Sequence, residues 1–243
     1  MRKETENWYV NWFNTDFYHT LYQDRNHKEA RLFMDNLIRY LKLPKGSGIL
    51  DLACGKGRHA IYLNALGYDV TGIDLSGNNI AFAQQFANET LHFDVHNMCV
   101  PYHRQFDAVF NLFTSFGYFD RDEDNLNTVR AIKANLKAGG YGVIDFMNVD
   151  YVADTLISED SKTVDGIVFH QKREFKDGYI VKEIRFRHDH RDYCFTERVK
   201  ALRLSDFELY FKQSGIVLSA VFGDYRLGAF DPETSERLIL IFT

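Results

Sequence analysis

The chain has 243 residues, with 29 Lys and Arg against 34 Asp and Glu, so its formal net charge is −5. This balance disfavours a basic surface for nucleic acid, and no apolar run reaches the roughly 20 residues that a membrane-spanning helix needs. The three cysteines, Cys54, Cys99 and Cys194, show neither the spacing of a disulfide framework nor that of a zinc site. No apolar signal core follows the first residues, so a cytoplasmic protein is expected.

The N-terminus is unusually aromatic. Phe, Tyr and Trp make up 15% of the chain. Seven of these residues lie within the first 22, namely Trp8, Tyr9, Trp12, Phe13, Phe17, Tyr18 and Tyr22. Disordered tails are poor in such side chains, so we expect this segment to be ordered against another part of the molecule.

The next part of the chain alternates between helical and extended patterns. Apolar residues recur at helical spacing from 28 to 43, and Pro44 ends that helix. The extended runs are 48–52, 69–74, 91–94, 106–111 and 141–146, and the helical patterns between them are 57–66, 77–87 and 123–137. Strands that alternate with helices predict a parallel sheet with right-handed crossovers.

The pattern changes after about residue 148. Residues 166–203 read as three strands joined by turns at 176–178 and 189–192, which predicts an antiparallel meander inserted at about 150–204. The α/β pattern then resumes with a helix, which a capping box at 205–208 opens and Gly215 closes. Two further strands are expected at 216–222 and 236–242. No linker composition separates these parts, so residues 1–243 are expected to form a single domain.

A glycine loop follows the first strand. Gly55 and Gly57 permit a tight turn, and they allow a ligand to approach backbone N–H groups at the start of a helix. Asp51 precedes the first glycine by four residues, and Asp74 ends the next strand 23 residues after Asp51. At that second position, the ribose of a bound nucleoside would present its hydroxyl groups to the carboxylate of Asp74.

These positions resemble the motifs of class I S-adenosylmethionine-dependent methyltransferases. The resemblance covers about residues 28–148 in order, through segments 49–57, 72–76, 94–101, 106–113 and 136–140. It implies a Rossmann-like, seven-stranded, mostly parallel sheet with helices on both faces and an antiparallel last strand. A nicotinamide dehydrogenase is disfavoured, because Asp51 would repel a pyrophosphate, whereas it can face the ammonium group of S-adenosylmethionine.

The resemblance also implies a cofactor site, and no metal is proposed. Asp74 would bind the ribose, Leu75 would pack beside the adenine, and Asp94 and the backbone of Val95 would bind the adenine edge. The methionine and ribose portions would contact Asp51, Ala53, Gly55, Gly57 and Leu112. An N-terminal helical lid, residues 1–27, would close over the cofactor and contribute Tyr18 and Arg25, with Arg25 pairing with the methionine carboxylate.

The implied reaction is an in-line transfer of the methyl group to a nitrogen or oxygen of a small molecule, giving S-adenosylhomocysteine. Candidate acceptor-site residues are Tyr22, Tyr118, Asn148, Tyr225 and Arg226. Loop 113–119 resembles that of small-molecule enzymes, including N-methyltransferases of amino sugars and glycine. A nucleic-acid (tRNA) methyltransferase and a non-catalytic S-adenosylmethionine-binding regulator stay open as alternatives. Neither a general base nor an oligomeric state is assigned.

Overall fold

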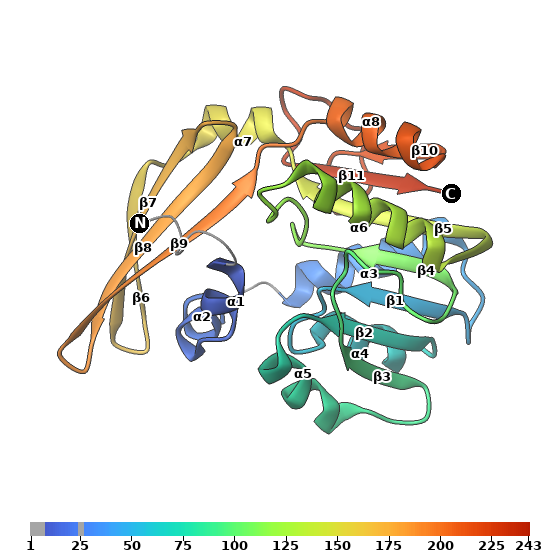
Figure 1. Cartoon of the computed structure of the whole chain (residues 1–243), viewed down its shortest axis with the longest axis horizontal. Coiled ribbons are helices and arrows are strands. Elements are labelled where there is room, and N and C mark those ends of the chain that lie inside the picture. The colour runs from blue at the N-terminus through green and yellow to red at the C-terminus, as the bar shows by residue number, and fades with distance from the viewer. Residues whose placement is uncertain (1–7, 24–26) are drawn as a thin grey trace.

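The computed structural model describes residues 8–23 and 27–243, which build two β-sheets and the helices around them (Figure 1). The central sheet has seven strands in the order β10-β11-β5-β4-β1-β2-β3. Its strands are β1 (Gly48–Leu52), β2 (Asp69–Asp74), β3 (Leu91–Val95), β4 (Phe106–Asn111), β5 (Leu136–Met147), β10 (Leu218–Phe222) and β11 (Arg237–Phe242). Only β11 runs antiparallel to its neighbours, β5 and β10. The predicted fold class is therefore confirmed.

Helices cover both faces of the central sheet (Figure 1). The helices are α3 (His27–Leu41), α4 (Arg58–Ala65), α5 (Gly77–Ala83) with a 3-10 turn η1 (Gln84–Phe86), α6 (Asp122–Asn135), α7 (Val149–Thr155) and α8 (Leu204–Ser214). In β11, Ile239 and Ile241 join the core beneath α3 and α4, whereas Leu238 and Leu240 join the core beneath α6 and α8. Alternation of side chains along each strand thus builds a core on each face.

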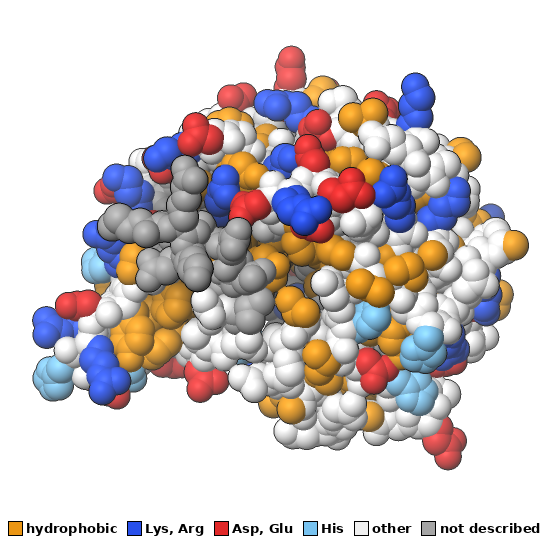
Figure 2. Space-filling model, in the orientation of Figure 1, with side chains coloured by type: hydrophobic (Ala, Val, Ile, Leu, Met, Phe, Trp, Pro, Cys, Tyr) orange, Lys and Arg blue, Asp and Glu red, His pale blue; other side chains and the backbone are white. Residues whose placement is uncertain are grey.

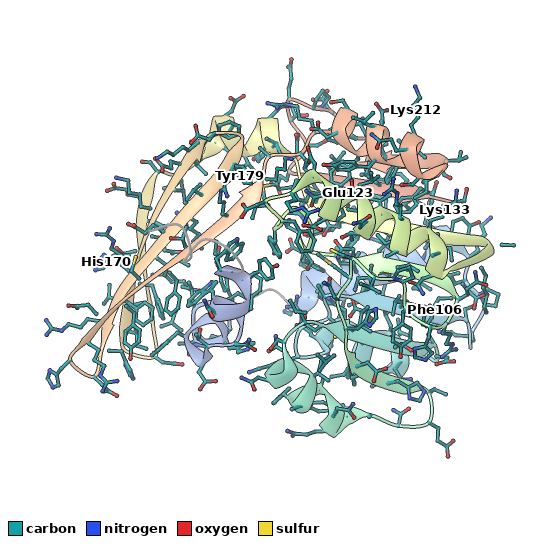
Figure 3. The ribbon with its side chains drawn as sticks, in the orientation of Figure 1. Phe106, Glu123, Lys133, His170, Tyr179 and Lys212 are labelled. Atoms are coloured by element: carbon teal, nitrogen blue, oxygen red, sulfur yellow. The ribbon has the colours of Figure 1, made fainter. Side chains whose placement is uncertain are left out.

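Two helix boundaries have clear local causes. Helix α8 ends as predicted at Gly215, whose φ of 64° is left-handed. Its start differs from the prediction, because the helix begins at Leu204 and the carboxylate of Asp206 accepts the backbone N–H of Arg203 at 2.7 Å. The predicted capping box at 205–208 is therefore wrong by two residues. Lys133 of α6, labelled in Figure 3, donates to the carbonyl of Ser214 at 2.7 Å and so joins the two helices.

The second sheet is antiparallel, with the order β6-β7-β8-β9. Its strands are β6 (Glu159–Val164), β7 (Ile167–Lys176), β8 (Tyr179–His188) and β9 (Arg191–Lys200). The two predicted turns join β7 to β8 and β8 to β9, with left-handed backbone at Asp177 and at Asp189 and His190. The sequence prediction missed β6, because its largely exposed, polar residues lack the alternation of a half-buried strand.

The two N-terminal helices, α1 (Trp8–Phe13) and α2 (Asp16–Leu21), lie between the two sheets (Figure 1). Trp8, Trp12 and Leu21 are buried in a cluster with apolar residues of the second sheet, among them Phe169 and Phe186. All seven N-terminal aromatic residues belong to this cluster or pack against it. Apolar side chains remain visible at the surface near α2 and the second sheet (Figure 2). The aromatic segment is thus ordered, chiefly against the second sheet.

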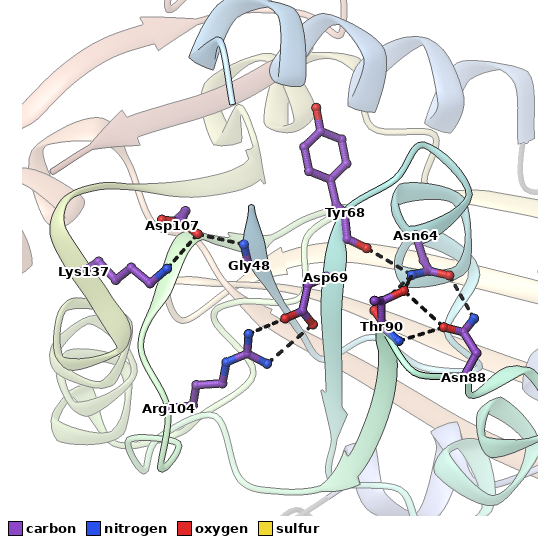
Figure 4. Close-up of polar contacts among 9 residues, drawn as sticks. All are labelled: Gly48, Asn64, Tyr68, Asp69, Asn88, Thr90, Arg104, Asp107 and Lys137. Atoms are coloured by element: carbon purple, nitrogen blue, oxygen red, sulfur yellow. Dashed lines mark hydrogen bonds and ion pairs between the residues drawn. The ribbon is translucent and has the colours of Figure 1, made fainter. Parts of the chain in front are cut away.

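Ion pairs and hydrogen bonds tie together the amino edge of the central sheet, where the parallel strands begin (Figure 4). Asp69 of β2 forms an ion pair with Arg104, which precedes β4. Asp107 of β4 accepts from the backbone N–H of Gly48 at 2.7 Å and from Lys137 at 2.9 Å. These contacts join neighbouring strands at the edge opposite to the glycine loop.

None of the helices formed by residues 8–23 and 27–243 combines the length and the apolar character needed to cross a membrane.

Candidate cofactor and acceptor site

The loop after β1 turns sharply before α4. Its residues Ala53, Gly55 and Gly57 have left-handed φ values of 57°, 57° and 81°. A Cβ atom at Gly57 would lie 2.6 Å from Cε1 of Phe93, so no larger residue fits there without displacing the ring of Phe93. A Cβ atom at Gly55 would meet nothing within 4 Å, because this glycine borders an open space. The loop therefore leaves its backbone accessible at the carboxyl edge of the sheet.

Two carboxylates flank this loop. Asp51 is only 2% exposed, and its Oδ2 atom has no hydrogen-bond partner among the described residues. Burial raises the pKa of Asp51 to about 7, and the nearby charge of Asp74 adds to the shift. Such a group is costly to ionise alone, so it favours a cationic partner.

Asp74 ends β2 and is held by backbone donors. Its Oδ2 accepts the N–H of Gly55 at 2.9 Å, and its Oδ1 accepts the N–H of Ser76 at 2.8 Å. Burial raises the pKa of Asp74, although these two hydrogen bonds oppose the shift. The side chain of Asn79 is a third donor to this carboxylate. A carboxylate offers about four acceptor positions, so the group can still accept a hydrogen bond from a ligand hydroxyl.

Both carboxylates line a cavity of about 340 Å³, called here the carboxyl-edge cavity. Eight predicted site residues meet in its wall, namely Tyr18, Tyr22, Asp51, Ala53, Gly55, Asp74, Leu112 and Tyr118. Further lining residues, which the sequence reasoning missed, are Phe13, His19, Gln23, Cys54, Lys56, Arg58, His59, Asn79, Phe113 and Ser115. Several of them could have been found from their position next to predicted residues, since Lys56 to His59 continue the glycine loop and Phe113 follows Leu112.

Other predicted residues lie outside this cavity wall. Leu75 and Val95 are 45% and 57% exposed, and Asp94 accepts a hydrogen bond from the hydroxyl of Tyr102. Val95 pairs in register with Asp74, so Val95 and its neighbour Asp94 lie at the carboxyl edge of the sheet, beside Asp74 of the cavity wall. Gly57 packs against Phe93 beneath the loop. Arg25 lies outside the described residues.

The remaining acceptor candidates occupy other places. The side-chain amide of Asn148 donates to the carbonyl oxygens of Pro232 and Ser235 at 2.9 and 2.8 Å, which holds the loop before β11. Tyr225 and Arg226 line a second cavity of about 790 Å³. The ring of Tyr225 lies 5.1 Å from that of Phe113, so this aromatic pair stands between the two cavities.

The N-terminal helices close one side of the carboxyl-edge cavity. The hydroxyl of Tyr22 donates to Glu197 of β9 at 2.6 Å and accepts from Lys182 of β8 at 2.7 Å. Trp12 donates to the same carboxylate at 2.7 Å. On the opposite side, His19 lies 3.1 Å from the amide oxygen of Asn79 in α5. These contacts connect the helices to the second sheet and to α5.

No cluster of His, Cys, Asp or Glu among residues 8–23 and 27–243 has the arrangement of a metal site. The donor set instead fits S-adenosylmethionine. Asp51 and Asp74 match a ligand that is cationic at sulfur and nitrogen, and Asp74 also matches a diol. Lys56 and Arg58 in the same wall match a ligand that carries a carboxylate as well. Asp51, with its orphaned oxygen, is the residue that fits the ammonium group.

The strand order, the glycine loop and the two acidic residues together define a Rossmann-like methyltransferase fold. Comparison with known proteins agrees, since residues 49–140 match the family described as methyltransferase domain. Residues 49–140 therefore match a methyltransferase domain, which confirms the predicted resemblance to class I S-adenosylmethionine-dependent methyltransferases.

Individual relatives point the same way. A putative methyltransferase of Bacillus subtilis, YqeM, is 36% identical over 108 residues, which are 42% of this chain and 43% of that protein. A dTDP-3-amino-3,4,6-trideoxy-alpha-D-glucopyranose N,N-dimethyltransferase of Streptomyces venezuelae is 29% identical over 158 residues, 63% of this chain and 65% of that protein. The chain thus spans less than two thirds of the length of either relative.

Among solved structures, an S-adenosylmethionine-dependent methyltransferase from Clostridium acetobutylicum superposes with a TM-score of 0.79. The superposition covers 93% of this chain and 96% of the other at 19% identity, which shows a shared fold.

Proposed function

We propose that this protein transfers the methyl group of S-adenosylmethionine to a nitrogen or oxygen atom of a small molecule. The observation that carries the proposal is the buried carboxylate of Asp51, whose Oδ2 atom lacks a hydrogen-bond partner among the described residues and which lines the same cavity as Asp74 and an aromatic wall. When bound, the cofactor supplies a methyl group already activated by its sulfonium centre. The chain then has to bind the cofactor and the acceptor, align the acceptor atom with the methyl group, and exclude water from the site.

Each wall of the cavity has a proposed task. Asp74 accepts hydrogen bonds from the ribose hydroxyls. Leu75, Asp94 and Val95 flank the adenine at the ends of the adjoining strands. Asp51 faces the ammonium group, and the backbone at Ala53, Gly55 and Gly57 underlies the cofactor together with Leu112. Tyr18 and Arg25 belong to the proposed lid, residues 1–27.

The acceptor is proposed to enter on the aromatic side. Tyr22 and Tyr118 line the cavity there. The name of the Streptomyces venezuelae relative, which describes an amino-sugar N,N-dimethyltransferase, supports a small polar acceptor for this chain too. The face in Figure 2 shows Lys and Arg interspersed with Asp and Glu, which disfavours a nucleic-acid substrate.

Two measurements test the proposal. Calorimetric titration should show S-adenosylmethionine binding to the full chain. A screen of a filtered small-molecule extract should then show release of S-adenosylhomocysteine, with the methylated product identified by mass. Release with tRNA alone would favour the nucleic-acid alternative, and binding without release from either source would indicate a non-catalytic binding protein.

A further inference from the structure

The chain adopts an unusual backbone directly after β4. Phe113 and Thr114 are consecutive residues with left-handed φ values of 57° and 58°. Neither is glycine, one is bulky and the other is β-branched, so both conformations cost free energy. Such strain persists only where surrounding structure holds it, and it concentrates at functional sites.

Two residues from distant parts of the sequence hold this backbone. The Oδ2 atom of Asp145, in β5, accepts the N–H of Phe113 at 2.7 Å. The carbonyl of Asp145 accepts the N–H of Thr114 at 3.0 Å. Arg237, at the start of β11, donates to the hydroxyl of Thr114 at 2.9 Å. The two strained residues are therefore fixed by three hydrogen bonds.

Asp145 and Arg237 are themselves paired in the interior. Their Oδ1 and Nη2 atoms lie 2.8 Å apart, and their side chains are 0% and 17% exposed. Buried ion pairs of this kind contribute little stability compared with apolar residues of similar size. A role in fixing one conformation of a loop accounts for charges placed here.

The loop that they fix forms the acceptor side of the carboxyl-edge cavity. Leu112, Phe113, Ser115 and Tyr118 all line that cavity. The ring of Phe113 stacks on His59 with centroids 4.7 Å apart and an interplanar angle of 19°. The hydroxyl of Tyr118 donates to the carbonyl of Thr114, so the loop conformation also sets the place of that tyrosine.

We propose that Asp145 and Arg237 are positioning residues, which orient the methyl acceptor by holding Phe113 and Thr114 in their left-handed conformation. The proposal rests on the proposed methyltransferase function. In-line displacement requires the nucleophile to lie on the axis through the methyl group, so a small shift of this wall slows the reaction. Most of the proposed cofactor-binding residues lie at the ends of β1, β2 and β3, and only Leu112 adjoins this loop, so the affinity for S-adenosylmethionine should depend little on the pair.

The main test is Arg237→Ala with chemical rescue. At saturating S-adenosylmethionine, release of S-adenosylhomocysteine from the filtered small-molecule extract should fall about 10- to 100-fold. The affinity for S-adenosylmethionine should stay within about twofold of the unmodified protein, since the cofactor walls are intact. Arg237 lines the second cavity, so added guanidinium should reach the vacated position and restore part of the rate, whereas ammonium should not.

Arg203→Ala is the matched control. Arg203 also pairs with an aspartate, Asp150, at 2.8 Å, but both side chains are about half exposed. This variant should release S-adenosylhomocysteine at the unmodified rate and should not respond to guanidinium.

A second variant keeps the proposal testable if Arg237→Ala fails to fold. Thr114→Val keeps the shape of the side chain and the ion pair and removes only the hydroxyl bonded to Arg237. Hydrogen exchange of the amides of Phe113 and Thr114 should accelerate, and release of S-adenosylhomocysteine should fall, without a matching drop in melting temperature.

The outcomes separate the two proposals. Unchanged release in both variants, or a loss in Arg237→Ala that guanidinium and ammonium restore equally, overturns the positioning role. If the unmodified protein releases no S-adenosylhomocysteine, the proposed function fails instead. Exchange at Phe113 and Thr114 then still decides whether the pair holds the loop, since equally slow exchange in both Arg237→Ala, which removes the pair, and Thr114→Val contradicts it.

Discussion

The carboxylates at the two edges of the central sheet differ in their partners. At the amino edge, Asp69 pairs with Arg104, and Asp107 is bonded to Lys137 and a backbone N–H. At the carboxyl edge, beside the glycine loop, Asp51 is buried and Asp74 is partly buried, and neither forms a salt bridge with a described residue. The carboxylates of Asp69 and Asp107 are thus paired with cations, whereas those of Asp51 and Asp74 beside the glycine loop are not, which is consistent with a ligand site there.

The pKa values show the same contrast. Burial alone would raise the pKa of Asp107, but its hydrogen bonds from Lys137 and Gly48 outweigh that effect and lower it. Burial raises the pKa of Asp51 and of Asp74. Carboxylates at one edge therefore favour folding at neutral pH, whereas those at the other are maintained at a cost that a cationic ligand offsets.

The largest expected effect comes from Asp74→Ala. Loss of charge-assisted hydrogen bonds to the ribose should weaken S-adenosylmethionine binding by about 1–3 kcal/mol in a calorimetric titration. Asp69→Ala removes a carboxylate from the other end of the same strand and is the control. It should leave binding unchanged, and equal losses in both variants would remove the distinction between the edges.

Asp51→Asn should separate binding from stability. The folded-state pKa of Asp51, about 7, exceeds the reference value of 3.8, so ionisation opposes folding, and stability should fall as the pH rises between these values. The amide variant lacks this penalty, and its free energy of unfolding at pH 8 should rise by about 1–2 kcal/mol in thermal melts.

The same variant should bind S-adenosylmethionine more weakly. In the unmodified protein, binding should weaken by up to about tenfold per unit as the pH falls below 7, because Asp51 must release its proton to face the ammonium group. This dependence should vanish in Asp51→Asn. A pH profile that is identical in the two proteins would show that another group is responsible.

A third variant tests the N-terminal helices, which cover only the carboxyl edge. Glu197→Gln weakens the hydrogen bonds from Tyr22 and Trp12 and removes the charge beside Lys182. We expect a loss of about 1 kcal/mol in the local stability of α1 and α2, seen as faster hydrogen exchange of their amides. Glu183→Gln, whose partner Arg185 is exposed on the same sheet, should leave this exchange unaltered.

The smallest effect is expected at the amino edge. Asp107 has a lowered pKa, so its stabilising contribution is present above the reference value of 3.8 and is lost as the pH falls through the folded-state value. Because Lys137 and Asp107 are 49% and 34% exposed, Asp107→Asn should cost less than about 1 kcal/mol at pH 7. Cofactor affinity should not change, and a calorimetric difference would contradict the assignment of the edges.

Much of the fold was predictable because its signals are local. The strand, the glycine turn and the helix from Ile49 to Ala60 are contiguous, and so are the residues that place Asp74 at a strand end. Strand β6 was missed, since its polar residues carry no periodic signal. Asn148, Tyr225 and Arg226 stay untested as acceptor residues, and the structure places them in other contacts.

The sequence by itself determined the class of domain, the carboxylates at the strand ends and the presence of an ordered aromatic N-terminus. Only the tertiary structure decided what those elements meet. Tyr22 bonds to Glu197 across 175 residues, and Arg237 bonds to Asp145 across 92. Such pairs leave no periodic mark in the sequence, because they depend on how strands far apart in the chain are ordered within and between the sheets. The proposed cofactor-binding residues thus lie in short, contiguous motifs, whereas the proposed acceptor wall takes its shape from contacts between residues far apart in the chain.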